Sequence, residues 1–306
     1  MFFSDSRRPL IFGEVLFDKF SDGKSVLGGA PFNVAWNLKG FGLDPLFVSS
    51  VGRDMEGDQI ITQMESWGLE VTGLFRDSEY PTGEIKIEMS GDRHTFNILP
   101  EQAYDFIDPG FLEERFGKRK FSLLYHGSLI TRSPVSRASL QMLYSSREIP
   151  RFIDVNLREP WFDTEEVCKT IVGATWVKLN NEELETLSGT SLPARGTLLE
   201  VAEKFREKSG IEYLIVTMGE EGAISSSSSG LVFHKAIKVK KVEDTVGAGD
   251  AFSSVIILGI SNRWTIERSM ERAIAFASEI CGIRGATSKD RSLYDRFLAD
   301  WGKQDA

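Results

Sequence analysis

The sequence predicts an α/β protein with a doubly wound, mainly parallel sheet that is flanked by helices and carries a small β-sheet lid. Short apolar runs of strand-forming residues recur along the 306-residue chain and end at glycine or polar turns. Amphipathic helical segments alternate with these runs, as expected for parallel strands that are buried on both faces. Two stretches depart from this pattern and alternate apolar with polar residues, which is typical of strands with one solvated face.

The apolar runs predict strands because β-branched and aromatic residues are enriched in them. Strands are expected at Leu10–Phe12, Leu46–Val48, Phe121–Tyr125, Arg151–Val155, Thr175–Leu179, Tyr213–Thr217 and Ala236–Val242. Helices are expected at Asp58–Trp67, Ser136–Ser146, Ala194–Ser209, Ala251–Ile260 and Ile266–Ile283. In a sheet of this kind, ligands bind at the carboxyl ends of the strands. The whole chain, residues 1–306, is interpreted as one domain.

The two stretches with a period of two, about residues 14–27 and 82–98, predict the lid. The second contains two strand-like runs around the turn Ser90-Gly91-Asp92, which indicates a β-hairpin. Such a hairpin between early βα units would form a flap; the alternative is an antiparallel extension of the main sheet. The serine run Ser225–Ser229 is interpreted as a solvated hairpin turn.

The composition excludes several classes of function. A net charge of −9 argues against a nucleic-acid groove, because phosphate backbones need a basic stripe. No apolar stretch reaches the roughly 18 residues of a membrane helix, and the first ten residues are too polar for a signal peptide. Cys168 and Cys281 are far apart and are interpreted as reduced core thiols. We therefore expect a cytoplasmic protein that binds small molecules.

Gly247-Ala248-Gly249-Asp250 lies between an expected strand and an apolar helix. Its small residues let the backbone approach a ligand, and the N–H groups at the helix start attract an anion without any lysine. A carboxylate such as Asp250 would repel that anion, so its presence here indicates a specific role. A general base that takes the proton of an attacking hydroxyl would have that role. The alternative is that Asp250 only favours the helix N-terminus. Dinucleotide, Walker A and nucleophile-elbow motifs are absent from the sequence.

Asp244-Thr245-Val246-Gly247-Ala248-Gly249-Asp250-Ala251-Phe252 resembles the C-terminal signature of the ribokinase-like (PfkB) carbohydrate kinases. Gly28-Gly29-Ala30-Pro31-Phe32-Asn33 resembles the N-terminal signature of the same family. Further similar segments follow in the family's order: Val51–Asp54, Thr82-Gly83, Asp154–Arg158, Asn180–Glu183 and Thr217–Gly222. The resemblance runs from about Gly13 to Ser288. It implies a ribokinase-like fold and ATP-dependent phosphorylation of a primary hydroxyl of a small sugar.

The resemblance also implies roles for individual residues. Asp250 would be the general base, with Gly247, Ala248 and Gly249 forming the anion hole. Sugar contacts are implied for Asp18, Gly28, Gly29, Asn33 and Arg158. Nucleotide contacts are implied for Lys178, Thr217, Gly219 and Gly222. Asn180 and Glu183 would hold Mg²⁺ through water, and Asp244, Thr245 and Gly285 would bind a monovalent cation such as K⁺. The lid often makes the dimer contact in this family, so a homodimer is expected.

The roles implied for Arg158, Asn180 and Glu183 can also be compared with what the residues alone predict. Asp154, Asn156 and Arg158 alternate at the end of an expected strand, so their side chains should share one face. Asn180 followed three residues later by Glu183 is also the pattern of a helix capping box.

The sequence leaves the substrate open. Within the family, the N-terminal signature and Asp154–Arg158 with Trp161 resemble fructokinases most closely, so fructose is the expected substrate. Fructokinases usually carry an arginine in the run after the lid, and Phe96–Asp105 has none. The alternatives are a 2-keto-3-deoxygluconate kinase, in which Arg158 would meet the carboxylate, and another sugar or nucleoside kinase. A non-catalytic nucleotide or sugar sensor and, more distantly, a dehydrogenase are the alternatives from other classes.

Overall fold

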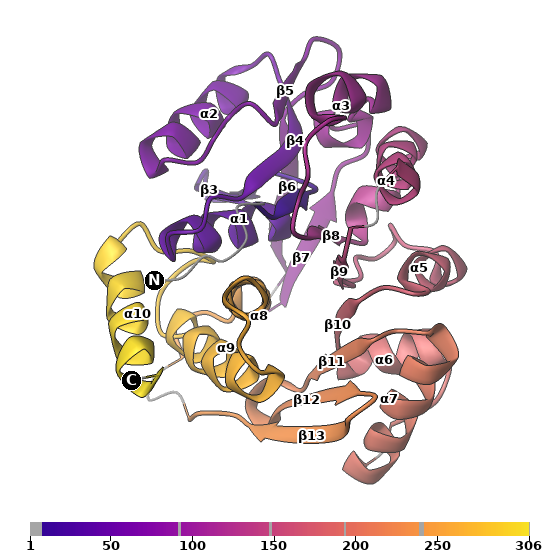
Figure 1. The fold of residues 1–306 in the computed structure, drawn as a ribbon. Helices are drawn as coiled ribbons and strands as arrows, with labels where there is room; N and C mark the ends of the chain where they lie inside the picture. Colours follow the sequence, from indigo (N-terminus) through magenta and orange to yellow (C-terminus); the bar gives the residue numbers. More distant parts are fainter. Residues whose placement is uncertain (1–7, 91–92, 147–148, 193, 239–241, 306) are drawn as a thin grey trace.

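The computed structural model of the chain describes residues 8–90, 93–146, 149–192, 194–238 and 242–305 (Figure 1). Its main sheet has nine strands. In spatial order they are β13 (Gly230–Lys235), β12 (Gly222–Ser227), β11 (Tyr213–Thr217), β10 (Trp176–Asn180), β9 (Arg151–Asp154), β8 (Leu124–Gly127), β1 (Leu10–Phe12), β4 (Leu46–Gly52) and β5 (Leu74–Asp77). All neighbouring pairs from β11 to β5 are parallel, and β12 and β13 extend the sheet as an antiparallel hairpin. The predicted mainly parallel sheet is therefore confirmed.

The order of the strands reverses next to β1. From β1 the chain builds outward through β4 and β5, and it then returns to place β8 on the other side of β1. Connections at such a switch point leave in opposite directions, which opens a crevice at the carboxyl ends of the two strands. The ligand crevice is therefore expected where β1 and β8 end.

Helices cover both faces of the sheet (Figure 1). One layer contains α1 (Ala30–Gly40), α2 (Met55–Trp67), α8 (Ala248–Asn262), α9 (Ile266–Ile280) and α10 (Arg291–Asp305). The other contains α3 (Pro109–Phe116), α4 (Pro134–Ser146), α5 (Thr164–Ile171), α6 (Asn181–Ser188) and α7 (Arg195–Ser209). Strand β1 shows why both layers are needed. Its Ile11 packs against the layer that contains α1 and α8, whereas Leu10 and Phe12 point to the other face and pack against the layer that contains α3 and α4. No helix among the described residues is long and apolar enough to span a bilayer.

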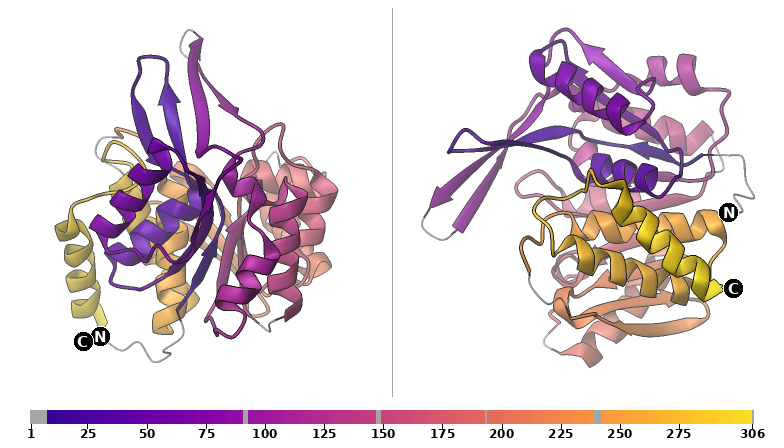
Figure 2. Two further views of the ribbon diagram at one scale, coloured as in Figure 1. Left: turned by 90° about the horizontal axis from the view of Figure 1, so that it is seen from above. Right: turned by 90° about the vertical axis from the view of Figure 1, so that its left-hand side faces the viewer.

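The two stretches with a period of two form a sheet of their own. It has four strands in the order β3 (Ser25–Gly28), β2 (Leu16–Phe20), β6 (Gly83–Ser90) and β7 (Arg93–Ile98). The central pair β2–β6 is parallel, so the sheet is not an antiparallel extension of the main one. Figure 2 shows that it projects away from the body of the molecule. Gly91 and Asp92 of the predicted turn lie outside the described residues.

Three local predictions were wrong. No strand forms in the described part of Ala236–Val242, because β13 has already ended at Lys235. Within Ser225–Ser229, the first three serines belong to β12, where Ser225 and Ser226 are buried, and only the last two form the turn. Strand β9 ends at Asp154, and Asn156 has a φ of 43°, so Asp154, Asn156 and Arg158 do not alternate along a strand.

Asp54 joins α2 to the base of the small sheet. As N-cap of α2 it accepts a hydrogen bond from the Gly57 amide (2.7 Å), and it also accepts from the amide (2.8 Å) and hydroxyl (2.6 Å) of Thr82. Burial alone would raise the pKa of Asp54, but the hydrogen bonds from Thr82 and Gly57 outweigh it and lower that pKa.

We expect Asp54→Ala to lower the free energy of unfolding by about 1–3 kcal/mol, because it removes a helix cap and orphans the Thr82 amide. Denaturant titration measures this change. Glu65→Ala, on the exposed side of the same helix, is the matched control and should change stability by less than about 0.5 kcal/mol. Equal effects of the two substitutions would contradict the role given to Asp54.

Candidate active site

Helix α8 begins at the predicted anion hole. Gly247 is its N-cap in a left-handed conformation (φ 80°), and an added Cβ would lie 2.4 Å from the Cα of Ala286. A side chain is therefore excluded by both conformation and space. Ala248 and Gly249 form the first turn, where backbone N–H groups have no partner within the helix. The start of α8 thus has the amides without helical partners and the close backbone packing that the predicted anion cradle requires.

Asp250 lies in the first turn of α8 and faces helix α1. Asn33 Nδ2 donates a hydrogen bond of 2.8 Å to Asp250 Oδ2, which joins residues 217 positions apart. Burial, together with the Asp154 carboxylate, raises the pKa of Asp250 to about 6, although the Asn33 hydrogen bond and the charges of Lys178 and Arg158 oppose that shift. A carboxyl with a pKa close to neutrality suits a general base.

A lysine also lies beside the start of α8, in addition to the backbone amides. Lys178 Nζ is 3.2 Å from the position that a Cβ on Gly249 would take. Both oxygens of Asp154 accept hydrogen bonds of 2.9 Å from this buried ammonium group. Ser253 on α8 donates to Asp154 at 2.7 Å, and Tyr125 donates at 3.3 Å. The buried pair fixes the lysine charge beside the start of α8.

The predicted sugar residues other than Arg158 lie on the small sheet and at the start of α1. An added Cβ on Gly28 would lie 3.0 Å from Asp18 Oδ2, and one on Gly29 would lie 2.6 Å from the backbone oxygen of Glu14. The small sheet therefore approaches the start of α1 at these two glycines. Burial raises the pKa of Asp18 to about 6, and the charge of Arg158 opposes that shift. Arg158 itself is exposed.

Glu14 was not predicted from the sequence. It directly follows Gly13 at the carboxyl end of β1 and is 4% exposed. Burial raises the pKa of Glu14 to about 7; its own backbone amide and the charges of Arg158 and Arg132 oppose that shift, while Asp250 adds to it. A carboxylate that directly follows a parallel strand was the signal that could have revealed it.

The predicted nucleotide and Mg²⁺ residues lie at the ends of β10 and β11. Asn180 and Thr217 are register partners on these strands. The capping-box reading of Asn180 is confirmed, since Asn180 Oδ1 accepts from the Glu183 amide and Glu183 Oε2 accepts from the Asn180 amide, both at 2.8 Å. Glu183 Oε1 accepts from the Leu157 amide, also at 2.8 Å. Beyond Thr217, Gly219 and Gly222 have positive φ in the turn that leads into β12.

Asp244 connects the two loops that meet beside Gly247. Its Oδ1 accepts from the Val246 amide at 3.0 Å, and its Oδ2 accepts from the Gly285 amide at 3.2 Å. Thr245 is exposed in the same turn. The structure thus brings together Asp244, Thr245 and Gly285, which the sequence grouped as a cation site.

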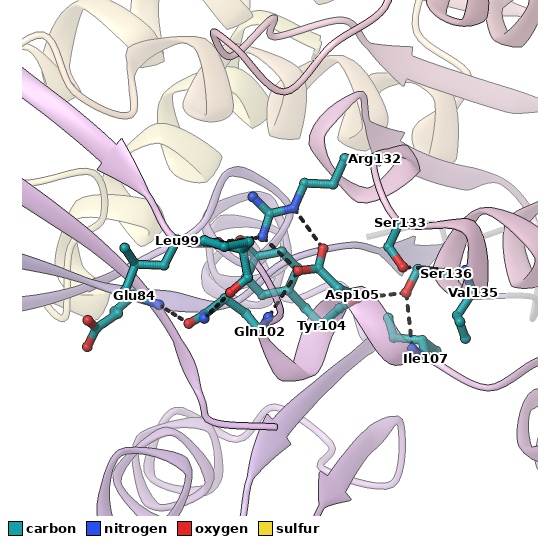
Figure 3. A network of polar contacts seen from close by, with 11 residues as sticks. Glu84, Leu99, Gln102, Tyr104, Asp105, Ile107, Arg132, Ser133, Val135 and Ser136 are labelled. Carbon is teal, nitrogen blue, oxygen red and sulfur yellow. Dashed lines mark hydrogen bonds and ion pairs between the residues drawn. The ribbon is translucent and has the colours of Figure 1, made fainter. Parts of the chain in front are cut away.

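A second polar network lies beneath the small sheet (Figure 3). Arg132 follows β8 and the short helix η2 (Leu129–Thr131), and it donates to both oxygens of Asp105 at 2.8 and 2.7 Å. It also donates to the carbonyl of Leu99, the residue after β7, at 2.7 Å. Its guanidinium packs over the ring of Trp161, with 4.6 Å between the guanidinium carbon and the ring centroid. Arg132 therefore ties the base of the small sheet to the main body.

Comparison with known protein families gives one match that extends over nearly the whole chain. Residues 7–292 match the model described as pfkB family carbohydrate kinase. The chain belongs to the pfkB family of carbohydrate kinases. As a member of this family it is an ATP-dependent phosphotransferase that acts on a sugar or nucleoside.

Relatives in the pfkB family differ in their substrates. A fructokinase from Escherichia coli is 29% identical over 302 residues, which covers 93% of this chain and 94% of the relative. An ATP-dependent 6-phosphofructokinase from Thermoanaerobacterium thermosaccharolyticum is 25% identical over 290 residues, with 88% and 86% covered. The structure of aminoimidazole riboside kinase from Salmonella enterica, complexed with aminoimidazole riboside and an ATP analog, matches with a TM-score of 0.80 and 22% identity over 95% of this chain and 99% of that one. The likeness in structure shows the ribokinase-like fold.

We expect Gly247→Ala to reduce phosphoryl transfer at least about tenfold, because the new methyl group would displace the loop at Ala286 as well as strain the backbone. Gly42→Ala is the matched control, since Gly42 has nearly the same φ (82°) but open space around its Cβ position. The control should cost about 1–2 kcal/mol of stability and leave turnover unchanged. Steady-state kinetics and thermal unfolding of both variants make the comparison; equal loss of turnover would contradict the close fit at Gly247.

Proposed function

We propose that this chain is an ATP-dependent sugar kinase that phosphorylates a primary hydroxyl group, with fructose as its substrate. The observation that carries the proposal is the hydrogen bond between Asn33 and Asp250. It joins an amide suited to sugar hydroxyls to a carboxyl that lies in the first turn of α8, beside an anion cradle. The fructokinase relative from Escherichia coli supports fructose as the first sugar to test.

In the proposed mechanism, a sugar hydroxyl lies against Asp250 and gives up its proton as it attacks the γ-phosphoryl group. The N–H groups of the Gly247–Gly249 turn and the Lys178 ammonium group stabilise the charge on the equatorial oxygens. Gly28, Gly29, Asn33, Asp18 and Arg158 hold the sugar. Thr217, Gly219 and Gly222 lie along the nucleotide, whose phosphates point to the start of α8.

Mg²⁺ fits this site only through water. Every side-chain oxygen of Asn180 and Glu183 that could bind it directly already accepts a backbone hydrogen bond, and no group of three acidic, histidine or cysteine residues could enclose a metal within the described ranges. Magnesium commonly keeps several water ligands and binds one carboxylate together with substrate phosphates. When bound, the ion would neutralise phosphate charge, with Asn180 and Glu183 holding its water shell.

We also propose that K⁺ binds near Asp244, Thr245 and Gly285, and that the small sheet is a lid that excludes water from the transfer and forms a homodimer contact. The Asp244–Gly285 hydrogen bond supports the cation site, because it holds two loops next to the anion cradle. The small sheet carries Asp18 and Gly28 and projects from the body of the molecule, which supports the lid (Figure 2).

A 2-keto-3-deoxygluconate kinase is the second candidate, favoured by the exposed Arg158 guanidinium, which could pair with a carboxylate. A coupled assay of ADP release tests all of the proposals on one panel of fructose, other sugars, nucleosides and the keto-acid. It is run with and without Mg²⁺ and K⁺. Preference for fructose supports the main proposal, and preference for the keto-acid would replace it. Ligand binding without ADP formation from any compound would make the chain a sensor.

We expect Asp250→Asn to lower kcat by about 10²–10⁴-fold, because the amide cannot accept the proton. Binding of ATP and of the sugar should stay near normal, since the amide keeps the size of the side chain. Single-turnover kinetics and calorimetric binding separate the two effects. Near-normal turnover of this variant would remove Asp250 from the role of base.

The pKa of Asp250, raised to about 6, predicts the acid side of the pH profile. Only the ionised carboxylate can take a proton, so kcat/KM should fall as the pH drops through about 6. Measuring kcat/KM of the wild type from mildly acidic to neutral pH checks this. An acid limb near the ordinary pKa of an aspartate, about 4, would contradict the burial of the base.

A further inference from the structure

Two buried polar atoms near the predicted sugar site have no hydrogen-bond partner among the described residues. They are Oε2 of Glu14, an acceptor, and Nη1 of Arg132, a donor. The side chain of Arg132 is 6% exposed, and Glu14 is 4% exposed. A buried polar atom without a partner loses about 1–3 kcal/mol relative to one that is paired, so each atom favours any ligand that could satisfy it.

Both atoms come from the loops at the switch point of the sheet. Glu14 follows β1 and Arg132 follows β8, and these are the two strands between which the strand order reverses. The crevice beyond such strand ends is the expected ligand position in an open α/β sheet. Glu14 also lies against the start of α1, since a Cβ added to Gly29 would lie 2.6 Å from the backbone oxygen of Glu14.

Glu14 offers an acceptor and Arg132 a donor, but these two side chains, both among the described residues, do not bond to each other. No hydrogen bond or ion pair joins Glu14 to Arg132 in the described part of the chain, and the other donors of Arg132 are used by Asp105, Leu99 and Tyr104. A hydroxyl group satisfies both ends at once, because it accepts from the guanidinium and donates to the carboxylate. A carboxylate could accept from Arg132, but it would be repelled by Glu14.

We propose that Glu14 and Arg132 together hold one hydroxyl group of the acceptor sugar, other than the hydroxyl that Asp250 activates, and so select a neutral hydroxyl-rich sugar over a sugar acid. This inference rests on the proposed kinase function and deepens it by assigning two specificity-determining residues. Asn33 Oδ1, a third buried acceptor without a described partner, lies on the same Asp250 side and would accept from a further hydroxyl.

The position of Arg132 links this contact to the small sheet. The same guanidinium that offers Nη1 donates to the carbonyl of Leu99, directly after β7. The same side chain donates two hydrogen bonds to Asp105 on the main body, so Arg132 stands between the end of β7 and that body. A hydroxyl held by Nη1 would therefore lie at the base of the small sheet, and an analogue without that hydroxyl would leave the buried atoms unpaired.

The experiment uses the best sugar found by the ADP-release panel and analogues of it that each lack one hydroxyl group. For the wild type, we expect one analogue to lose about 10- to 100-fold in kcat/KM through this contact, mostly in KM. Glu14→Gln should impose a similar loss on the parent sugar but almost none on that analogue, because the contact is already missing. Glu203→Gln, on the exposed face of α7, is the matched control and should change neither value.

Several outcomes would overturn the proposal. If Glu14→Gln weakens every analogue equally, Glu14 has only a structural role or holds an ordered water. If the kcat/KM values of the variant for the parent sugar and all analogues equal those of the wild type, the Glu14 carboxylate does not contact the sugar. Should Glu14→Gln fail to fold, calorimetric binding of the same analogues to the wild type decides, and uniform affinities refute the pair. A wild type that phosphorylates no sugar rejects the proposed function itself, which is a separate result.

Discussion

The reversal of strand order between β1 and β8 is the constraint on which the rest of the site depends. It opens the sheet at the carboxyl ends of these strands and leaves room for α1 and α8 to begin there. Helix α1 supplies Asn33 and α8 supplies Asp250, and the 2.8 Å hydrogen bond between them spans the crevice. Without that opening, the two signature segments, far apart in sequence, could not share one ligand.

The charges in the crevice are arranged in two groups. Beside the start of α8, the Asp154 carboxylate accepts two hydrogen bonds from Lys178 and further ones from Ser253 and Tyr125, which offset the cost of burying the ion pair. On the sugar side, burial raises the pKa of Glu14, Asp18 and Asp250. In the proposed mechanism, phosphate charge would thus be met by the Lys178 ammonium group and helix amides, whereas the sugar would be met mainly by acceptors.

Most of the fold could be predicted because periodicity and strand composition act locally. The alternation of strands and helices, and the strands of the small sheet, all follow from patterns within a few residues. The prediction of a strand at Ala236–Val242 was wrong for its described residues, because an apolar run does not reveal whether a neighbouring strand is available to pair with it. Here β13 already occupies the edge of the sheet. The prediction of a turn at Ser225 and Ser226 was wrong because neighbouring strands are available. Pairing with β11 and β13 holds these serines in β12 and buries them, although serine alone favours a turn.

The site was predictable where small motifs carry the chemistry and unpredictable where contacts cross the fold. Gly247–Asp250 and Asn33 were proposed as site residues from their local patterns. The contact of Lys178 with the Gly249 position, and the placement of Glu14 and Arg132 in loops after adjacent strands, depend on which strands are neighbours. That order is set by packing across the whole sheet, so no short segment records it.

We propose that phosphoryl transfer takes place at the start of α8, between the Gly247–Gly249 amides and a sugar hydroxyl held by Asp250. A crystal structure with the preferred sugar, ADP and aluminium fluoride tests it most directly, because the fluoride complex mimics the transferring phosphoryl group. Our account expects the fluoride group against the Gly247–Gly249 amides and Lys178 Nζ, with one sugar hydroxyl between it and Asp250. Binding of that group elsewhere, or a sugar with no hydroxyl within hydrogen-bond reach of Asp250, would contradict the account.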